Sequence, residues 1–177
     1  MRDTLDNRVA ADLLKGAVAG AAATWVMGQV TTWLYDRENA AARAREDRAR
    51  DGKTAYGVAA EKAAEAAQLE ISGETEQQAG RAIHWALGIT AGAVYGVLRK
   101  RWPATARLKG LPFGTGFFLV FDELLNPVLG LTPGPAEFPW QAHARGLGGH
   151  LTFGVVSELV LEGLDRSFTS GSSIFAR

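Results

Sequence analysis

The sequence predicts an all-α fold: a membrane-embedded bundle of four helices, formed by a single domain over residues 1–177. Charged residues are sparse in four long apolar runs, whereas a soluble helical bundle would show a charged face along every helix. Each run reaches the roughly 20 residues that a helix needs to cross a bilayer. The four expected spans cover about residues 13–35, 79–98, 111–131 and 142–164.

Composition excludes several classes of function. The chain has no cysteine, which rules out disulfides, thiol catalysis and zinc–thiolate sites. Lysine and arginine together number 19, as do aspartate and glutamate, so the totals do not indicate nucleic-acid binding. The sequence shows no glycine-rich phosphate loop and no nucleophile elbow. We therefore expect a non-enzymatic protein with no catalytic residue, no cofactor and no metal, whose partner is the lipid bilayer.

The first run, 13–35, is expected to be a retained membrane span. Acids precede it and the run is long, which does not suit a signal peptide. The charged connection 36–78 is rich in alanine, arginine and glutamate and predicts helix over residues 40–67, interrupted near Asp51 and Gly52. Because its apolar residues are mostly alanine, we expect a solvated helical pair that packs thinly at the membrane surface. A docking surface for a partner is the alternative.

Small residues recur every four positions in the first two runs. Such rows let helix backbones approach closely in lipid, where no hydrophobic force drives association. Packing within one chain is the favoured interpretation, with a homo-oligomer or another membrane protein as the alternative. The glycines expected at these contacts are Gly16, Gly20, Gly28, Gly88, Gly92 and Gly96.

The loop between the second and third runs is strongly basic. Residues 99–109 hold five basic residues and no acid, whereas the connection 130–141 holds no basic residue. The positive-inside rule therefore places the loop 99–109 in the cytoplasm. With four spans, the N- and C-termini are expected on the same side.

The third run carries two adjacent acids, Asp122 and Glu123, near its middle. An acid at the centre of a membrane helix costs about 2.5–3.5 kcal/mol on insertion scales, so each needs a partner or water inside the protein. Neighbours on an α-helix point about 100° apart. Since Asp122 shares a face with Asn126, Asp122 is expected to be the inward member of the pair.

The helical rise places polar residues from all four runs at one level, in the outer half of the membrane. Histidines bonded to acids there would either lock the helices in register or form a proton-titrating site, because imidazole changes charge near neutrality. Both interpretations remain open. The expected cluster comprises Gln29, His84, Asp122, Glu123, Asn126 and His150. Two further acids, Glu158 and Glu162, fall in the inner half, where Glu162 is expected to pair with Lys15.

One stretch of the sequence is distinctive enough to indicate a family. The segments Gly130-Leu131-Thr132-Pro133 and Pro139-Trp140 lead into Gly149-His150 of the fourth run, and His84-Trp85 starts the second. In this order they resemble the YagU-like family of bacterial inner-membrane proteins, long labelled as of unknown function. The resemblance covers about residues 80–166.

This resemblance implies a location in the bacterial inner membrane, and the enteric member of the family is associated with acid resistance. The family has no established catalytic residues, and the long charged connection 36–78 departs from the enteric pattern. We therefore predict a small multi-pass inner-membrane protein with cytoplasmic termini that contributes to acid tolerance through the polar cluster. The alternative is a structural or partner-binding membrane subunit without transport activity.

Overall fold

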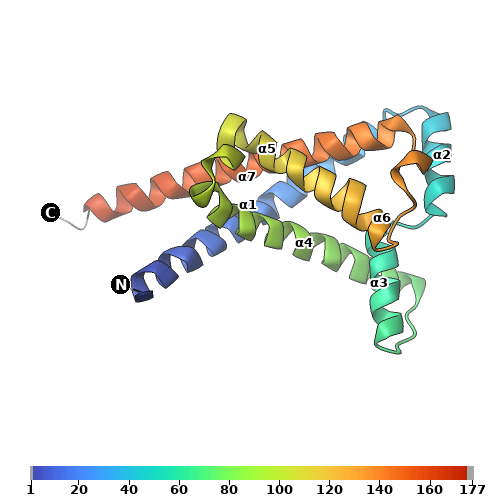
Figure 1. Ribbon diagram of the computed structural model, residues 1–177, viewed down its shortest axis with the longest axis horizontal. Coiled ribbons are helices and arrows are strands. Elements are labelled where there is room, and N and C mark those ends of the chain that lie inside the picture. The colour runs from blue at the N-terminus through green and yellow to red at the C-terminus, as the bar shows by residue number, and fades with distance from the viewer. Residues whose placement is uncertain (1, 175–177) are drawn as a thin grey trace.

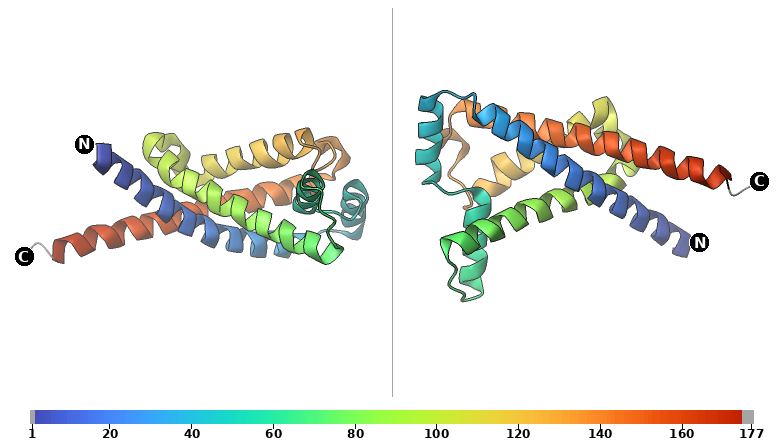
Figure 2. Two further views of the ribbon diagram at one scale, coloured as in Figure 1. Left: turned by 90° about the horizontal axis from the view of Figure 1, so that it is seen from below. Right: turned by 180° about the vertical axis from the view of Figure 1, so that it is seen from behind.

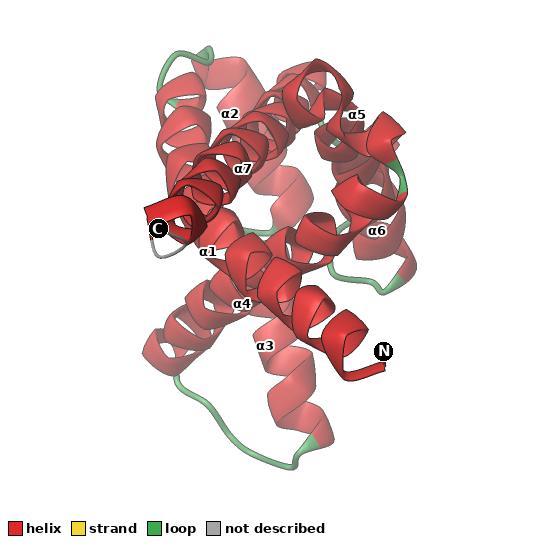
Figure 3. Ribbon diagram, turned by 90° about the vertical axis from the view of Figure 1, so that its left-hand side faces the viewer, coloured by secondary structure: helices red, strands yellow, loops and turns green. Residues whose placement is uncertain are grey.

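The computed structural model describes residues 2–174, which form helices and connecting loops without a strand. The helices are α1 (Arg2–Tyr35), α2 (Ala40–Arg50), α3 (Ala55–Ala66), α4 (Gly73–Arg101), α5 (Arg107–Phe118), α6 (Asn126–Val128) and α7 (Trp140–Ile174). Two short turns, η1 (Pro103–Ala106) and η3 (Pro135–Glu137), lie in loops, and a π-helical segment, η2 (Leu119–Leu125), joins α5 to α6. Figure 3 shows helices and loops throughout the described chain, so the all-α class is confirmed.

Each expected apolar run lies within helical structure. The first, second and fourth runs lie in α1, α4 and α7, and the third becomes α5, η2 and α6 in succession. Helix α1 packs against both α4 and α7, and α5 packs against α7. The first and last described residues lie at one end of the molecule, whereas α2 and α3 lie at the opposite end (Figures 1 and 2). The long segments therefore traverse the molecule an even number of times.

The contact between α1 and α4 is built on glycine. An ideal Cβ added to Gly20 would lie 2.5 Å from the carbonyl oxygen of Gly88, closer than real Cβ contacts occur, so the two backbones touch. The glycines in this contact are Gly16, Gly20, Gly88, Gly92 and Gly96. Gly28 lies outside it, because an ideal Cβ there meets nothing within 4 Å. The small-residue rows of the first two runs thus face each other within one chain.

A second glycine contact joins α5 to α7 and was not expected from the sequence. An ideal Cβ on Gly154 would lie 3.1 Å from the backbone nitrogen of Gly114. The chain enters this contact through a turn in which Gly110 has a φ of 80°, a conformation that favours glycine. Beside it, the rings of Tyr95 and Phe113 stack with centroids 4.2 Å apart. This aromatic stack fills the space between α4 and α5.

Ion pairs connect the helices at the end that holds the first and last described residues. Glu158 of α7 is only 3% exposed, and Arg99 of α4 donates hydrogen bonds to both of its carboxylate oxygens, at 2.5 and 2.9 Å. The hydroxyl of Tyr95 donates to the same carboxylate at 2.6 Å. Burial would raise the pKa of Asp165, but hydrogen bonds from Lys15 and Arg99 hold that pKa below its usual range. Each buried carboxylate here has a cationic donor.

The expected ion pair between Lys15 and Glu162 is wrong. Lys15 Nζ lies 2.8 Å from Asp165, about one turn further along α7, and Glu162 is bound by Lys109 at 2.6 Å. The prediction counted depth along straight, parallel spans. The crossing of α1 with α7 and the turn that brings Lys109 back against α7 both shift the partners by about one turn (Figure 1).

By length and hydropathy, α1 alone among the described helices could cross a membrane, over Asn7–Tyr35 with a mean hydropathy of 1.3. Of the four spans expected from the sequence, only the first meets this criterion of length and hydropathy. Glycine, histidine and charged residues lower the hydropathy of α4 and α7. The third run is divided among α5, η2 and α6, and it carries the acid pair.

The charged connection folds as the expected helical pair but packs more closely than alanine content suggested. It forms α2 and α3, separated at Asp51 and Gly52, which both have positive φ. Helix α3 packs against α4 and buries Ala55, Gly57 and Ala60. The adjacent residue, Tyr56, is inserted between the long helices, where it borders the cavities described next.

Candidate functional site

Both acids of the third run lie in η2, where the helix widens to π-helical geometry. Pro127 accounts for the change, because it lacks an N–H and its ring would clash with the carbonyl of Glu123 in a regular α-helix. A π-helical turn moves that carbonyl away, and such turns are frequent at functional sites. It also reduces the angle between neighbouring side chains. Asp122 and Glu123 therefore both reach histidines of α7, although α-helical geometry had favoured Asp122 alone.

The two ring nitrogens of His143 contact Glu123 and the carbonyl group of Pro135. His143 Nδ1 lies 2.6 Å from Glu123 Oε1, and His143 Nε2 lies 3.0 Å from the carbonyl oxygen of Pro135. That carbonyl can only accept, so Nε2 carries a hydrogen. The short contact to Glu123 then requires a second proton, held either by the imidazole or by the carboxyl group. Sequence analysis missed His143, because its position at the start of the fourth run suggested only a helix boundary.

His150 and Asp122 form a second, looser pair deeper in the bundle. His150 is 3% exposed, and its Nδ1 lies 2.9 Å from the carbonyl oxygen of Gly146, so this nitrogen carries a hydrogen. Asp122 Oδ2 lies 3.7 Å from the same nitrogen, within ion-pair range but beyond a hydrogen bond. The rings of Phe117 and Phe118 pack beside the imidazole, at centroid distances of 4.9 and 5.7 Å.

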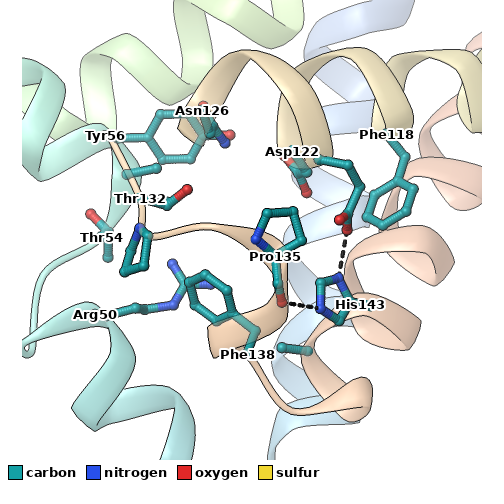
Figure 4. A pocket seen from close by; sticks show the side chains of 14 residues that line it. Arg50, Thr54, Tyr56, Phe118, Asp122, Asn126, Thr132, Pro135, Phe138 and His143 are labelled. Atoms are coloured by element: carbon teal, nitrogen blue, oxygen red, sulfur yellow. Dashed lines mark hydrogen bonds and ion pairs between the residues drawn. The ribbon is translucent and has the colours of Figure 1, made fainter. Parts of the chain in front are cut away.

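The first cavity, of about 230 Å³, brings the acid pair together with residues from the charged connection. In Figure 4, His143 lies between the carboxylate bonded to it and Pro135, with Asp122 and Asn126 on the helical side. The charged connection contributes Arg50, Thr54 and Tyr56 to the lining. The connection thus borders this cavity at the end opposite the first and last described residues.

A second cavity, of about 800 Å³, lies between α1, α3 and α4 and contains the other predicted polar residues, Gln29 and His84. Tyr56 borders both cavities, and its ring packs 4.8 Å from that of His84. Burial raises the pKa of the Tyr56 hydroxyl, and the charge of Asp122 adds to the shift. A third, small cavity of about 10 Å³ is bordered by Tyr56, His84 and His150. This volume is at the lower limit for one water molecule.

The structure therefore divides the expected cluster into two groups. Asp122, Glu123 and Asn126 border the first cavity, whereas His84 and Gln29 border the second, and Gln29 is exposed. His150 lies between the groups. Within the described residues, no three histidine, aspartate or glutamate side chains are arranged to hold a metal ion.

Comparison with known proteins identifies the family. A family model described as a protein of unknown function (DUF1440) matches residues 53–159, more than half of the chain. The chain belongs to the DUF1440 family. YagU-like proteins are this family, so the resemblance seen in the sequence is confirmed. No curated protein and no solved structure matches the chain.

The DUF1440 match includes Tyr56, which borders both cavities, and all three histidines. It does not include α1 and α2. A clasp centred on Arg145 joins these outer helices to the matched part. Arg145 of α7 binds Glu38 at the end of α1, and it donates to both carboxylate oxygens of Glu46 in α2 at 2.6 Å. The side chains of all three residues are largely buried.

We expect Arg145→Ala to detach α2 from the bundle. The change leaves the buried carboxylate of Glu38 without its cationic partner and that of Glu46 with only the ion pair to Arg50, which should cost about 2–3 kcal/mol of stability. Hydrogen–deuterium exchange of the purified protein should show faster exchange across α2. Arg48→Ala, on an exposed position of the same helix, serves as the control. Equal exchange in both variants would show that the clasp does not hold α2.

Proposed function

We propose that this DUF1440 protein is a multi-pass inner-membrane protein that transfers protons through its carboxylate–histidine pairs and so contributes to acid tolerance. The contact that carries the proposal is the Glu123–His143 pair, whose 2.6 Å separation needs a proton between its two atoms and which lies beside a cavity. Imidazole exchanges protons near neutral pH and is the usual proton shuttle in proteins. Ionisable groups inside membrane helices commonly mark proton relays.

The surface supports embedding of all four long segments. Polar and charged groups of the long helices lie inside the bundle, where Thr24, His150, Ser157 and Glu158 are almost fully buried. Large apolar side chains face outward, an arrangement that favours lipid over water as the surrounding medium. They include Leu14, Val18, Trp25 and Trp33 of α1, Ile89 and Val94 of α4, Leu119 and Leu124 of η2, and Leu159 of α7.

The arrangement of the ends supports the orientation. The basic loop 99–109 lies at the same end as the described ends of α1 and α7, since Lys100 pairs with Asp12 and Lys109 with Glu162. The positive-inside rule places this end in the cytoplasm. The first cavity, which the charged connection borders, then lies near the outer end of the molecule, the side from which acid arrives.

Helix α7 carries further polar groups between the first cavity and the end that holds the basic loop. His143, His150 and Ser157 recur every seven residues, which places them on one face of the helix. Ser157 is fully buried, and its hydroxyl oxygen has no hydrogen-bond partner in the described chain. Each step is about 10 Å along the helix, so water molecules would bridge the groups.

The proposal is tested by proton entry into liposomes that contain the purified protein and a trapped pH dye. After the outside is acidified, the wild-type protein should speed acidification of the lumen. Glu123→Gln and His150→Ala should each slow this entry about tenfold or more, as loss of a proton-transfer group does. Glu137→Gln, an exposed acid at the same end, is the matched control and should conduct as the wild type does.

Entry no faster than through empty liposomes would exclude proton transfer. If the variants then lowered only the melting temperature, the carboxylate–histidine pairs would have a structural role, in which they hold η2 against α7. That outcome would support the second candidate, a structural or partner-binding membrane subunit. The close fit of Glu123 with His143, at 2.6 Å, is the observation that favours this alternative.

A further inference from the structure

The larger cavity has the size and the position of a ligand site that the proton-transfer proposal does not use. Its volume of about 800 Å³ falls within the range of small-molecule sites. Three elements border it: α1, the start of α3 and the first half of α4. It lies on the other side of Tyr56 from the acid pair.

Two opposite charges in this cavity are unpaired. Arg81 and Glu76, both on α4, make no hydrogen bond or ion pair with the described part of the chain. The other charged group of the lining, Lys53, already donates to both carboxylate oxygens of Glu61, at 2.6 and 2.8 Å. Arg81 lies five positions after Glu76, which corresponds to about 7.5 Å along the helix. The cavity therefore presents at separate points one guanidinium and one carboxylate that have no hydrogen-bond partner in the described chain, and the charge of Lys53 acts on the carboxylate from a distance.

The outer edge of the cavity is aromatic. Trp25 of α1 is 60% exposed and Trp85 of α4 is 40% exposed, and both line the cavity. Indole rings favour the boundary between hydrocarbon and polar headgroups, because one end is apolar and the N–H can donate a hydrogen bond. The amides of Gln29 and Gln77 lie on the same lining and can bond to ester or phosphate oxygens.

We propose that this cavity binds one phospholipid with a phosphoethanolamine headgroup. Arg81 binds the phosphate, for which the planar guanidinium is well suited, and Glu76 accepts hydrogen bonds from the primary ammonium. The acyl chains lie along Trp25 and Trp85. A trimethylammonium headgroup has no N–H to offer Glu76, and a purely anionic headgroup has no donor for it. The proposal rests on membrane embedding, but it is independent of proton transfer.

The test is native mass spectrometry of the protein released from nanodiscs that contain equal amounts of phosphatidylethanolamine, phosphatidylcholine and phosphatidylglycerol. The wild-type protein should retain one phosphatidylethanolamine in preference to the other two lipids. Arg81→Gln should lower this retention about tenfold, the effect of losing a charge-assisted hydrogen bond. Glu76→Gln should instead abolish the preference for phosphatidylethanolamine while some lipid is still retained.

Matched controls lie on the same helix, outside the cavity. Arg101→Gln and Glu74→Gln remove an exposed cation and an exposed acid, and both should retain lipid as the wild type does. Trp85→Ala should weaken retention of all three lipids. Equal retention of the three lipids by the wild type, or equal losses in the control and cavity variants, would overturn the proposal. Unchanged proton entry in Arg81→Gln would show that this site and the acid–histidine pairs are separate.

Discussion

Arg99→Leu should be among the most destabilising single changes in this protein. It leaves the buried carboxylate of Glu158 with a single donor, the hydroxyl of Tyr95. It also removes one of the hydrogen-bond donors of Asp165. Breaking a buried ion pair by removing one partner typically costs about 3–5 kcal/mol. Chemical unfolding of the detergent-solubilised protein, followed by tryptophan fluorescence, should show this loss.

The double variant Arg99→Leu/Glu158→Leu distinguishes the cost of an unpaired charge from the value of the pair. Replacing both partners removes the buried charge, so the double variant should be more stable than the single one. Glu162→Gln, whose ion pair with Lys109 is exposed, should change stability by less than about 1 kcal/mol. If Arg99→Leu cost no more than Glu162→Gln, the buried pair would not hold α4 to α7.

Gly92→Leu should force α1 and α4 apart. An ideal Cβ at this position would lie 2.5 Å from the carbonyl oxygen of Gly16 and 2.6 Å from the backbone nitrogen of Gly20. These are backbone atoms, which cannot move aside as a flexible side chain can. Overpacking of this kind costs about 3 kcal/mol or more when the backbone must shift. The melting temperature in detergent should fall accordingly.

Gly28→Ala provides the matched control for the glycine rows. Its ideal Cβ meets nothing within 4 Å, so alanine fits without a clash. Alanine is favoured over glycine inside a helix by about 0.5–1 kcal/mol, and the variant should be slightly more stable than the wild type. A Gly92→Leu protein as stable as Gly28→Ala would mean that the two backbones are not in contact.

Some of the candidate site could be predicted from the sequence. Counting depth along the helices placed Asp122 and His150 at one level, and they lie 3.7 Å apart. The same count placed Gln29 in the cluster, but it is exposed and lies in the other cavity. Depth fixes one coordinate of a residue, whereas the face of the helix on which it lies decides what it meets.

Two residues of the site, His143 and Tyr56, belong to no sequence pattern that indicates a functional role. His143 stands at the start of a helix, and only the loop that carries Pro135 makes it a bridge between Glu123 and a carbonyl group. Tyr56 lies in a segment dominated by alanine, where a single aromatic residue indicates little. A proline four residues after an acid was the available signal for the π-helical turn, and it predicts a disturbed helix without specifying the form.

The sequence by itself determined the all-α class, the positions of the four long helical segments, the break at Asp51 and Gly52, and the family. These follow from local properties: apolar runs, helix propensity, turn residues and an ordered motif. Only the tertiary structure decided which charges meet, as in Arg99 with Glu158 and Lys15 with Asp165. The physical reason is that a shift of one turn between two crossing helices changes every partner across their contact. The sequence of either helix alone does not determine that shift.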